Sequence, residues 1–183
     1  MKKKLIIATI LIIFISFGWF AYTNLYPDQN LRRYSVYYAH NMEHKEGTHP
    51  EMAMALENIK AIRTPASRGI GYDYDGLAKV YNERNKNNGI VPWICATYAQ
   101  KNTEYLYVSC DNNSYIFNAD FTLKTVYNRD SANLDPEKSD IDEEELYNEV
   151  YKNFGFLVEA NVNRKPLINM QKEFNKKYYK RFN

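Results

Sequence analysis

The chain has 183 residues, a formal net charge of +2, and 45% hydrophobic against 25% charged residues, which suits one domain plus a terminal segment. Seventeen Tyr and nine Phe argue against an intrinsically disordered chain. Three lysines at positions 2–4 precede the first apolar run, so the remainder is close to neutral and gives no electrostatic reason to expect nucleic-acid binding.

Residues 5–22 read LIIATILIIFISFGWFAY and contain no charge. A helix of this length measures about 27 Å, close to the hydrocarbon thickness of a bilayer. The preceding lysines keep the N-terminus on the cytoplasmic side, so the remainder is expected outside the cytoplasm. The sequence therefore predicts a basic cytoplasmic segment (1–4), a single-pass transmembrane anchor (5–22), a linker (23–30) and an extracytoplasmic domain (31–183).

A cleaved secretory signal begins in the same way, and residues 16–18 (Ser-Phe-Gly) could serve as its cleavage site. Trp19, Phe20 and Tyr22 follow as an aromatic cluster, which is typical of a lipid–water interface. We therefore favour a retained anchor in the cytoplasmic membrane. Secretion after cleavage remains the alternative.

The first half of the domain is expected to be helical. Apolar positions favour a helix over 31–46, ended by a glycine. Thr48 is expected to cap a second helix, whose apolar stripe runs over 52–62. Two glycines within 67–74 predict a loop, and Asp75 is expected to cap a further short helix whose inward face is Leu77, Val80 and Tyr81.

The apolar period then changes from 3.6 to 2, which predicts an antiparallel meander. The expected strands are 90–99, 104–110, 114–118 and 121–128. In the second of these, Leu106 and Val108 share one face, while Tyr107 points the other way, so part of that other face is expected to be covered or to bind something. An acidic loop leads to a helix over 141–154, ended by Gly155, and Pro166 is expected to open a last helix. The predicted fold class is α+β, with an antiparallel sheet of about four strands flanked by helices.

Charge is segregated toward the C-terminal end of the chain. Residues 135–149 are strongly acidic and residues 164–181 are strongly basic. The simpler interpretation is two solvated helix faces. The alternative is that the basic stretch contacts anionic lipid or an acidic partner.

The two cysteines, Cys95 and Cys110, both lie in the exported part. They are expected on the same face of neighbouring strands, opposite or diagonal to each other according to the register of the turn. An oxidising compartment favours a disulfide between them, and two buried free thiols are the alternative.

One short pattern could carry chemistry. His40, Glu43 and His44 spell H-x-x-E-H, and on a helix the two histidines would share one face at a spacing that suits a metal. The string resembles the pattern of inverzincin metallopeptidases, in which the histidines bind zinc and the glutamate activates a water. The resemblance covers only these five residues, so the simpler expectation is solvent-exposed polar side chains.

Nucleophile, P-loop and dinucleotide motifs are not found in the sequence, so we predict no catalytic residue and no cofactor. We expect a non-enzymatic protein-binding module at the membrane, such as an inhibitor, an immunity factor or an envelope-complex subunit, with an unidentified envelope protein as its partner. A zinc-binding protein or metal-dependent hydrolase centred on His40, Glu43 and His44 is the alternative.

Overall fold

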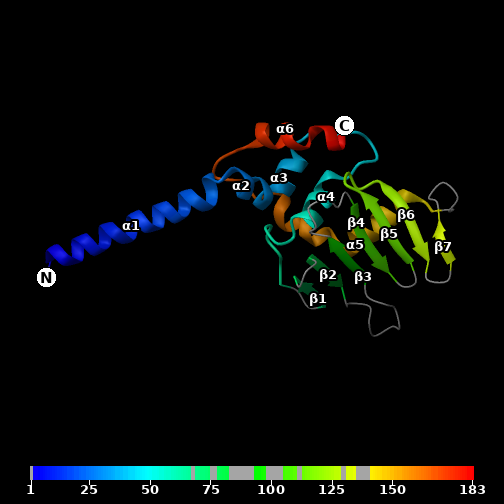
Figure 1. Cartoon of the computed structure of the whole chain (residues 1–183), viewed down its shortest axis with the longest axis horizontal. Helices are drawn as coiled ribbons and strands as arrows, with labels where there is room; N and C mark the ends of the chain where they lie inside the picture. Colours follow the sequence, from blue (N-terminus) through cyan, green and yellow to red (C-terminus); the bar gives the residue numbers. More distant parts are fainter. Residues whose placement is uncertain are drawn as a thin grey trace.

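The computed structural model describes residues 2–66, 69–74, 78–82, 93–97, 105–110, 113–128, 131–134 and 141–183. Within the N-terminal helix, side chains are described for residues 6–21. The chain is a mixed α+β protein with helices and an antiparallel sheet (Figure 1), as the sequence predicts.

Helix α1 (Lys2–Leu25) extends away from the rest of the chain (Figure 1). Its large apolar side chains are exposed, from 42% at Phe20 to 71% at Phe14. Among the residues that the structure describes, no helix is both long enough and apolar enough to cross a membrane.

The sheet is a single antiparallel meander in which each strand pairs with its neighbours in sequence, in the order β1-β2-β3-β4-β5-β6-β7. Its strands are β1 (Ile70–Asp73), β2 (Ala78–Asn82), β3 (Trp93–Thr97), β4 (Tyr105–Cys110), β5 (Asn113–Asn118), β6 (Leu123–Asn128) and β7 (Ser131–Leu134). The four strands expected from the sequence correspond to β3, β4, β5 and β6.

The predictions of a loop over 67–74 and of a helix after Asp75 are wrong for residues 70–73 and 78–82, which the structure describes as strands. Residues 70–73 form β1, and β2 alternates strictly, with Ala78, Val80 and Asn82 buried between half-exposed neighbours. This period of 2 is that of a strand with one buried face. The β7 strand lies in a stretch that the sequence assigned to a loop.

The single helix expected over 31–46 is also wrong. Three short helices occupy the region before the sheet: α2 (Pro27–Arg33), α3 (Ser35–His40) and α4 (Pro50–Glu57). Tyr34 separates the first two with non-helical backbone angles, and the helical part ends at His40. The expected second helix is present as α4; its start at Pro50 agrees with the expected one to within two residues, but it ends at Glu57 rather than Ile62.

Helix α5 (Glu143–Val162) is longer than predicted, because Gly155 lies buried inside it and does not end it. Asp142 caps its start: the carboxylate accepts hydrogen bonds from the backbone N–H groups of Glu144 and Glu145, at 2.9 and 3.1 Å. The last helix, α6 (Gln171–Phe182), begins five residues after Pro166 rather than at it.

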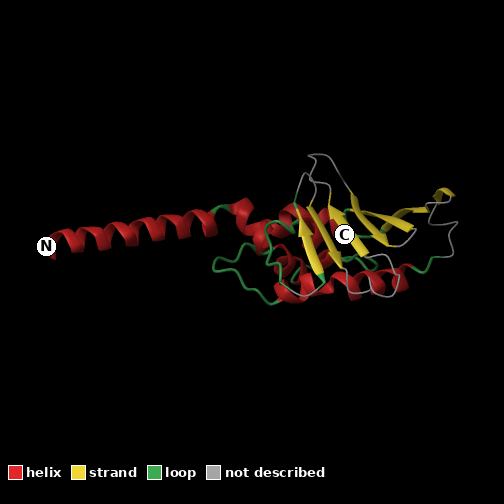
Figure 2. Cartoon of the chain, turned by 90° about the horizontal axis from the view of Figure 1, so that it is seen from below, coloured by secondary structure: helices red, strands yellow, loops and turns green. Residues whose placement is uncertain are grey.

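The core lies between the helices and one face of the sheet. Figure 2 shows the strands on one side and helices on the other, and α4 contacts β3 and β4 directly. The core side chains include Val36, Met52, Leu56, Leu106, Val108, Phe117, Val126, Val150, Phe154 and Leu157. The predicted α+β class is therefore built as two layers.

Helix α6 is joined to the first helices by a buried polar network at Tyr38. The Tyr38 hydroxyl donates to the Asn30 side-chain oxygen at 2.6 Å and accepts from the Met170 backbone N–H at 3.2 Å. The Gln171 side chain donates to the Tyr38 carbonyl at 2.8 Å. The network satisfies groups that would otherwise be costly to bury.

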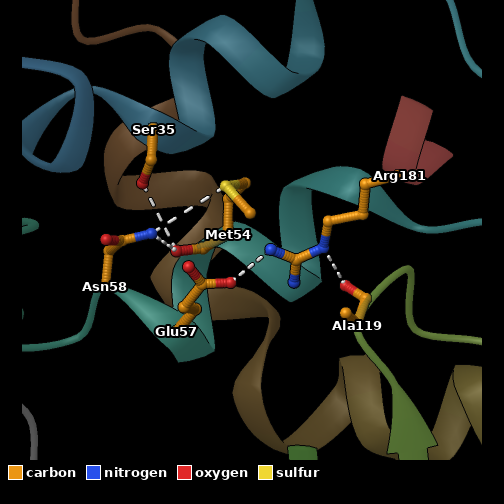
Figure 3. Close-up of polar contacts among 6 residues, drawn as sticks. All are labelled: Ser35, Met54, Glu57, Asn58, Ala119 and Arg181. Carbon is orange, nitrogen blue, oxygen red and sulfur yellow. Dashed lines mark hydrogen bonds and ion pairs between the residues drawn. The ribbon is translucent and has the colours of Figure 1, made fainter. Parts of the chain in front are cut away.

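The far end of α6 is held by Arg181 (Figure 3). Its guanidinium lies 2.5 Å from a Glu57 carboxylate oxygen, at the end of α4, and its Nε donates to the Ala119 carbonyl at 2.6 Å. In the same view, the Ser35 hydroxyl donates to the Met54 carbonyl at 3.3 Å and joins α3 to α4. Arg181 thus connects α6 to both layers of the fold.

Candidate functional site

The face of the sheet opposite the helices carries half-exposed side chains. In β4, Leu106 and Val108 are buried, whereas Tyr107 and Ser109 alternate with them and are half-buried. Successive residues of a strand point to opposite faces, so the tyrosine and the serine lie on the face away from the core. No described helix covers this face (Figure 2). We call it the open face.

The strand register aligns the open-face residues in two rows across the sheet. One row is Gly71, Tyr81, Ile94, Ser109, Ser114 and Tyr127. In the other row, Tyr107 lies opposite Ile116, and Ile116 lies opposite Thr125. Tyrosines from β2, β4 and β6 therefore share this surface.

Two of these tyrosines are held in place by neighbours on the same face. The Tyr81 ring occupies the space above Gly71, where an added Cβ would lie 1.9 Å from a ring carbon. The Tyr107 hydroxyl and the Ser114 hydroxyl are 2.8 Å apart. The open face is thus partly ordered before any partner binds, whereas Tyr127, at 39% exposure, projects further into solvent.

The sequence predicted part of this surface. The alternation in β4 placed Tyr107 on the face away from the core and indicated that part of that face binds something or is covered. Tyr81 was assigned to the inward side of a helix, so its place on the open face was missed. A two-residue period over 78–82 was the signal that could have found it.

In the structure, His40 and His44 do not share a helix. Helix α3 ends at His40, and the following residues are not helical, so the two histidines do not lie one helical turn apart. The His40 Nδ1 lies 3.1 Å from a carboxylate oxygen of Glu51 in α4. The His44 Nδ1 lies 3.1 Å from the Thr48 hydroxyl oxygen, which itself donates to the Lys45 carbonyl.

Glu43, the third residue of the pattern, has its backbone carbonyl bonded to the Asn183 side-chain amide at 2.9 Å. Among the described residues, no group of three or more His, Cys, Asp or Glu side chains is arranged to hold a metal ion. The helical spacing that suggested zinc at His40, Glu43 and His44 is therefore not present in the described fold.

The third histidine, His49, is more buried than His40 and His44. His49 packs against Tyr147 of α5, and burial lowers the pKa of the imidazole, against a smaller raising effect from Glu51. Burial likewise raises the pKa of the Tyr147 phenol. These rings join α4 to α5 and are part of the core boundary rather than an open site.

The cysteines lie on adjacent strands in a diagonal register. Cys95 is directly opposite Val108, so Cys110 is two residues further along β4 on the same face. Diagonal neighbours are typically about 7–8 Å apart, longer than the Cα separation of most disulfides. The side chains of Cys95 and Cys110 lie outside the described set, so the disulfide stays a prediction.

No protein-family model matches this chain, and neither a curated protein nor a solved structure is significantly similar to it.

Proposed function

We propose that this chain is a membrane-tethered, non-enzymatic binding module that recognises a protein partner through the open face of its sheet. The observation that carries the proposal is the one-sided covering of the sheet: helices pack on one face, and the other face has tyrosines from three strands. A face of a seven-stranded sheet with tyrosines on it offers a broad surface with aromatic side chains, which are enriched where proteins bind each other.

Tyrosine suits such a role because it buries a large area at low entropic cost and keeps a hydroxyl for hydrogen bonding. Tyr81 and Tyr107 are already held by Gly71 and Ser114, which reduces the ordering cost of binding. The exposed Tyr127 is the residue most able to adjust to a partner.

The tether is α1. The proposal for it rests on the uncharged segment 5–22 behind the lysines at 2–4, and on the exposure of apolar side chains along the described part of the helix. Water disfavours such a surface, and lipid accepts it. In this arrangement the domain lies outside the cytoplasm, at the membrane.

Site-specific photo-crosslinking tests the binding surface. A photoreactive phenylalanine analogue replaces Tyr107 or Tyr127 in the full-length chain in native membranes, and replaces Tyr179 of α6 as the control. Tyr179 is 48% exposed but lies on a different element. We expect the two open-face positions to form the same discrete adduct and the control position to form none.

Two results would contradict the proposal. If the control position Tyr179 formed the same adduct as the open-face positions, the crosslinking would be nonspecific. If neither open-face position formed an adduct, the open face would not be the binding surface. The tether is checked separately in the same membranes: the full chain should resist alkaline extraction, and protease added outside intact cells should degrade residues 31–183.

A further inference from the structure

Three arginines from distant parts of the sequence lie together near the start of the domain. Arg33 is the last residue of α2, Arg63 follows α4, and Arg164 follows α5. The Asn161 side chain joins two of these segments, because its oxygen accepts from the Arg63 backbone N–H at 2.9 Å and its amide donates to the Arg63 carbonyl at 2.8 Å. The fold itself therefore brings the segments that carry these arginines together.

The Arg164 guanidinium lies over the ring of Tyr34, 5.1 Å from the ring centre, and is half-buried there. Burial lowers the pKa of Arg164, Tyr34 raises it in part, and the positive charges of Arg33 and Arg63 lower it further. Among the described residues, none of the three arginines forms an ion pair with a carboxylate. The cluster therefore has positive charge that favours binding of an external anion.

An exposed apolar segment continues directly from this cluster. Leu167 is 71% exposed and Ile168 is 36% exposed. The segment is held in place because the Asn30 side chain donates to the Ile168 carbonyl at 3.4 Å. Asn30 belongs to α2, which follows α1 after a single residue, so the segment lies at the end of the domain nearest α1 (Figure 1).

We propose that Arg33, Arg63 and Arg164 bind the phosphate headgroups of anionic lipids in the bilayer that holds α1. The exposed side chains of Leu167 and Ile168 enter the headgroup region beside them. Arginines supply paired N–H donors that fit phosphate oxygens, and basic residues close to a membrane are attracted to anionic lipid. The inference rests on the tether proposed above and adds a second contact, which fixes how the domain lies on the membrane.

Hydrogen exchange tests this contact in the full-length chain, reconstituted in nanodiscs of neutral phosphatidylcholine with and without phosphatidylglycerol. We expect the backbone amides of residues 163–170 to exchange more slowly in the anionic discs. The protection ratio is the exchange rate of these amides in neutral discs divided by that in anionic discs. In the variant Arg63→Gln/Arg164→Gln this ratio should fall by roughly fivefold for each charge removed. The single variant Arg63→Gln changes an exposed side chain only and should lose part of it.

The control is Lys176→Gln/Lys180→Gln, which removes two exposed charges from α6 and should keep the lipid difference. Equal exchange in both kinds of disc, for a chain that remains anchored, would overturn the headgroup contact alone. Failure of the chain to stay in neutral discs would overturn the tether as well. Equal protection by inorganic phosphate in neutral discs would assign the cluster to soluble phosphate and overturn the lipid proposal.

Discussion

The imidazole of His49 stacks on the phenol ring of Tyr147, with ring centroids 3.4 Å apart and an interplanar angle of 9°. Tyr147 also packs edge-on against Phe121 at the end of the sheet, so the stack connects α4, α5 and the β5–β6 turn. Burial in this position removes water from the imidazole and disfavours its protonated form, and the pKa of His49 is therefore lowered.

We expect the free energy of unfolding to fall as the pH drops below the ordinary histidine pKa of about 6.5. Because the folded pKa of His49 is lowered, the unfolded chain binds more protons in the window just below that value, and stability therefore rises with pH there. His49→Phe keeps a stacked ring without a titrating group. The pH dependence of the urea midpoint should be weaker in this variant than in the natural chain, and an unchanged dependence would contradict the assignment to His49.

Replacing Tyr38 by Phe should lower the free energy of unfolding by about 1–3 kcal/mol, because the buried Asn30 side chain and the Met170 N–H each lose a hydrogen bond with the Tyr38 hydroxyl. Denaturant titration monitored by circular dichroism measures the change. The matched control is Tyr179→Phe, which removes an exposed hydroxyl and should change stability by less than about 0.5 kcal/mol. Equal effects of the two substitutions would rule out a special role for the Tyr38 hydroxyl.

Gly155→Ala should destabilise the fold, although alanine is the better helix former by about 1 kcal/mol. An added Cβ would lie 2.6 Å from a ring carbon of Tyr151, so the ring must move. We expect a net loss of about 1–2 kcal/mol in thermal or chemical unfolding. In a Tyr151→Leu background the same substitution should cost less. A full cost in that background would place the clash elsewhere.

Arg181→Gln should loosen α6, because the guanidinium bonds both Glu57 and Ala119. Glu57 is partly exposed, so solvent screening limits the expected loss to about 1–2 kcal/mol. Hydrogen exchange of residues 171–183 should become faster. Lys180→Gln removes a neighbouring exposed charge and serves as the control; faster exchange in both variants would indicate a general charge effect.

The sequence predicted the strands from β3 to β6 because their two-residue alternation and turn residues are local signals. It missed β1 and β2, because the glycines indicated a loop and because Val80 and Tyr81 follow Leu77 by three and four residues, which is a helical spacing. Gly71 is compatible with a strand here because the Tyr81 ring from the next strand covers it, a contact that a single segment cannot reveal.

Helix α5 continues through Gly155 for a related reason, since the Tyr151 ring takes the place of a side chain at that position. For the candidate site, the pattern in β4 indicated an outward Tyr107, whereas the histidine spacing failed because the helix ends at His40. The arginine cluster could not be predicted at all: Arg33, Arg63 and Arg164 converge only through tertiary contacts.

The meander has a consequence for the order of folding. Each strand pairs with the next strand in sequence, so less chain entropy is lost in forming the sheet than in forming contacts between distant parts of the chain. The bonds that join α6 to Tyr38 and Glu57 span 132 and 124 residues of sequence. The loop-closure cost of such contacts is greater, which favours late docking of α6 onto helices α3 and α4 that already pack on the sheet. Late docking of α6 predicts a slow refolding phase whose rate changes when Arg181 is substituted but not when residues of β4 or β5 are substituted.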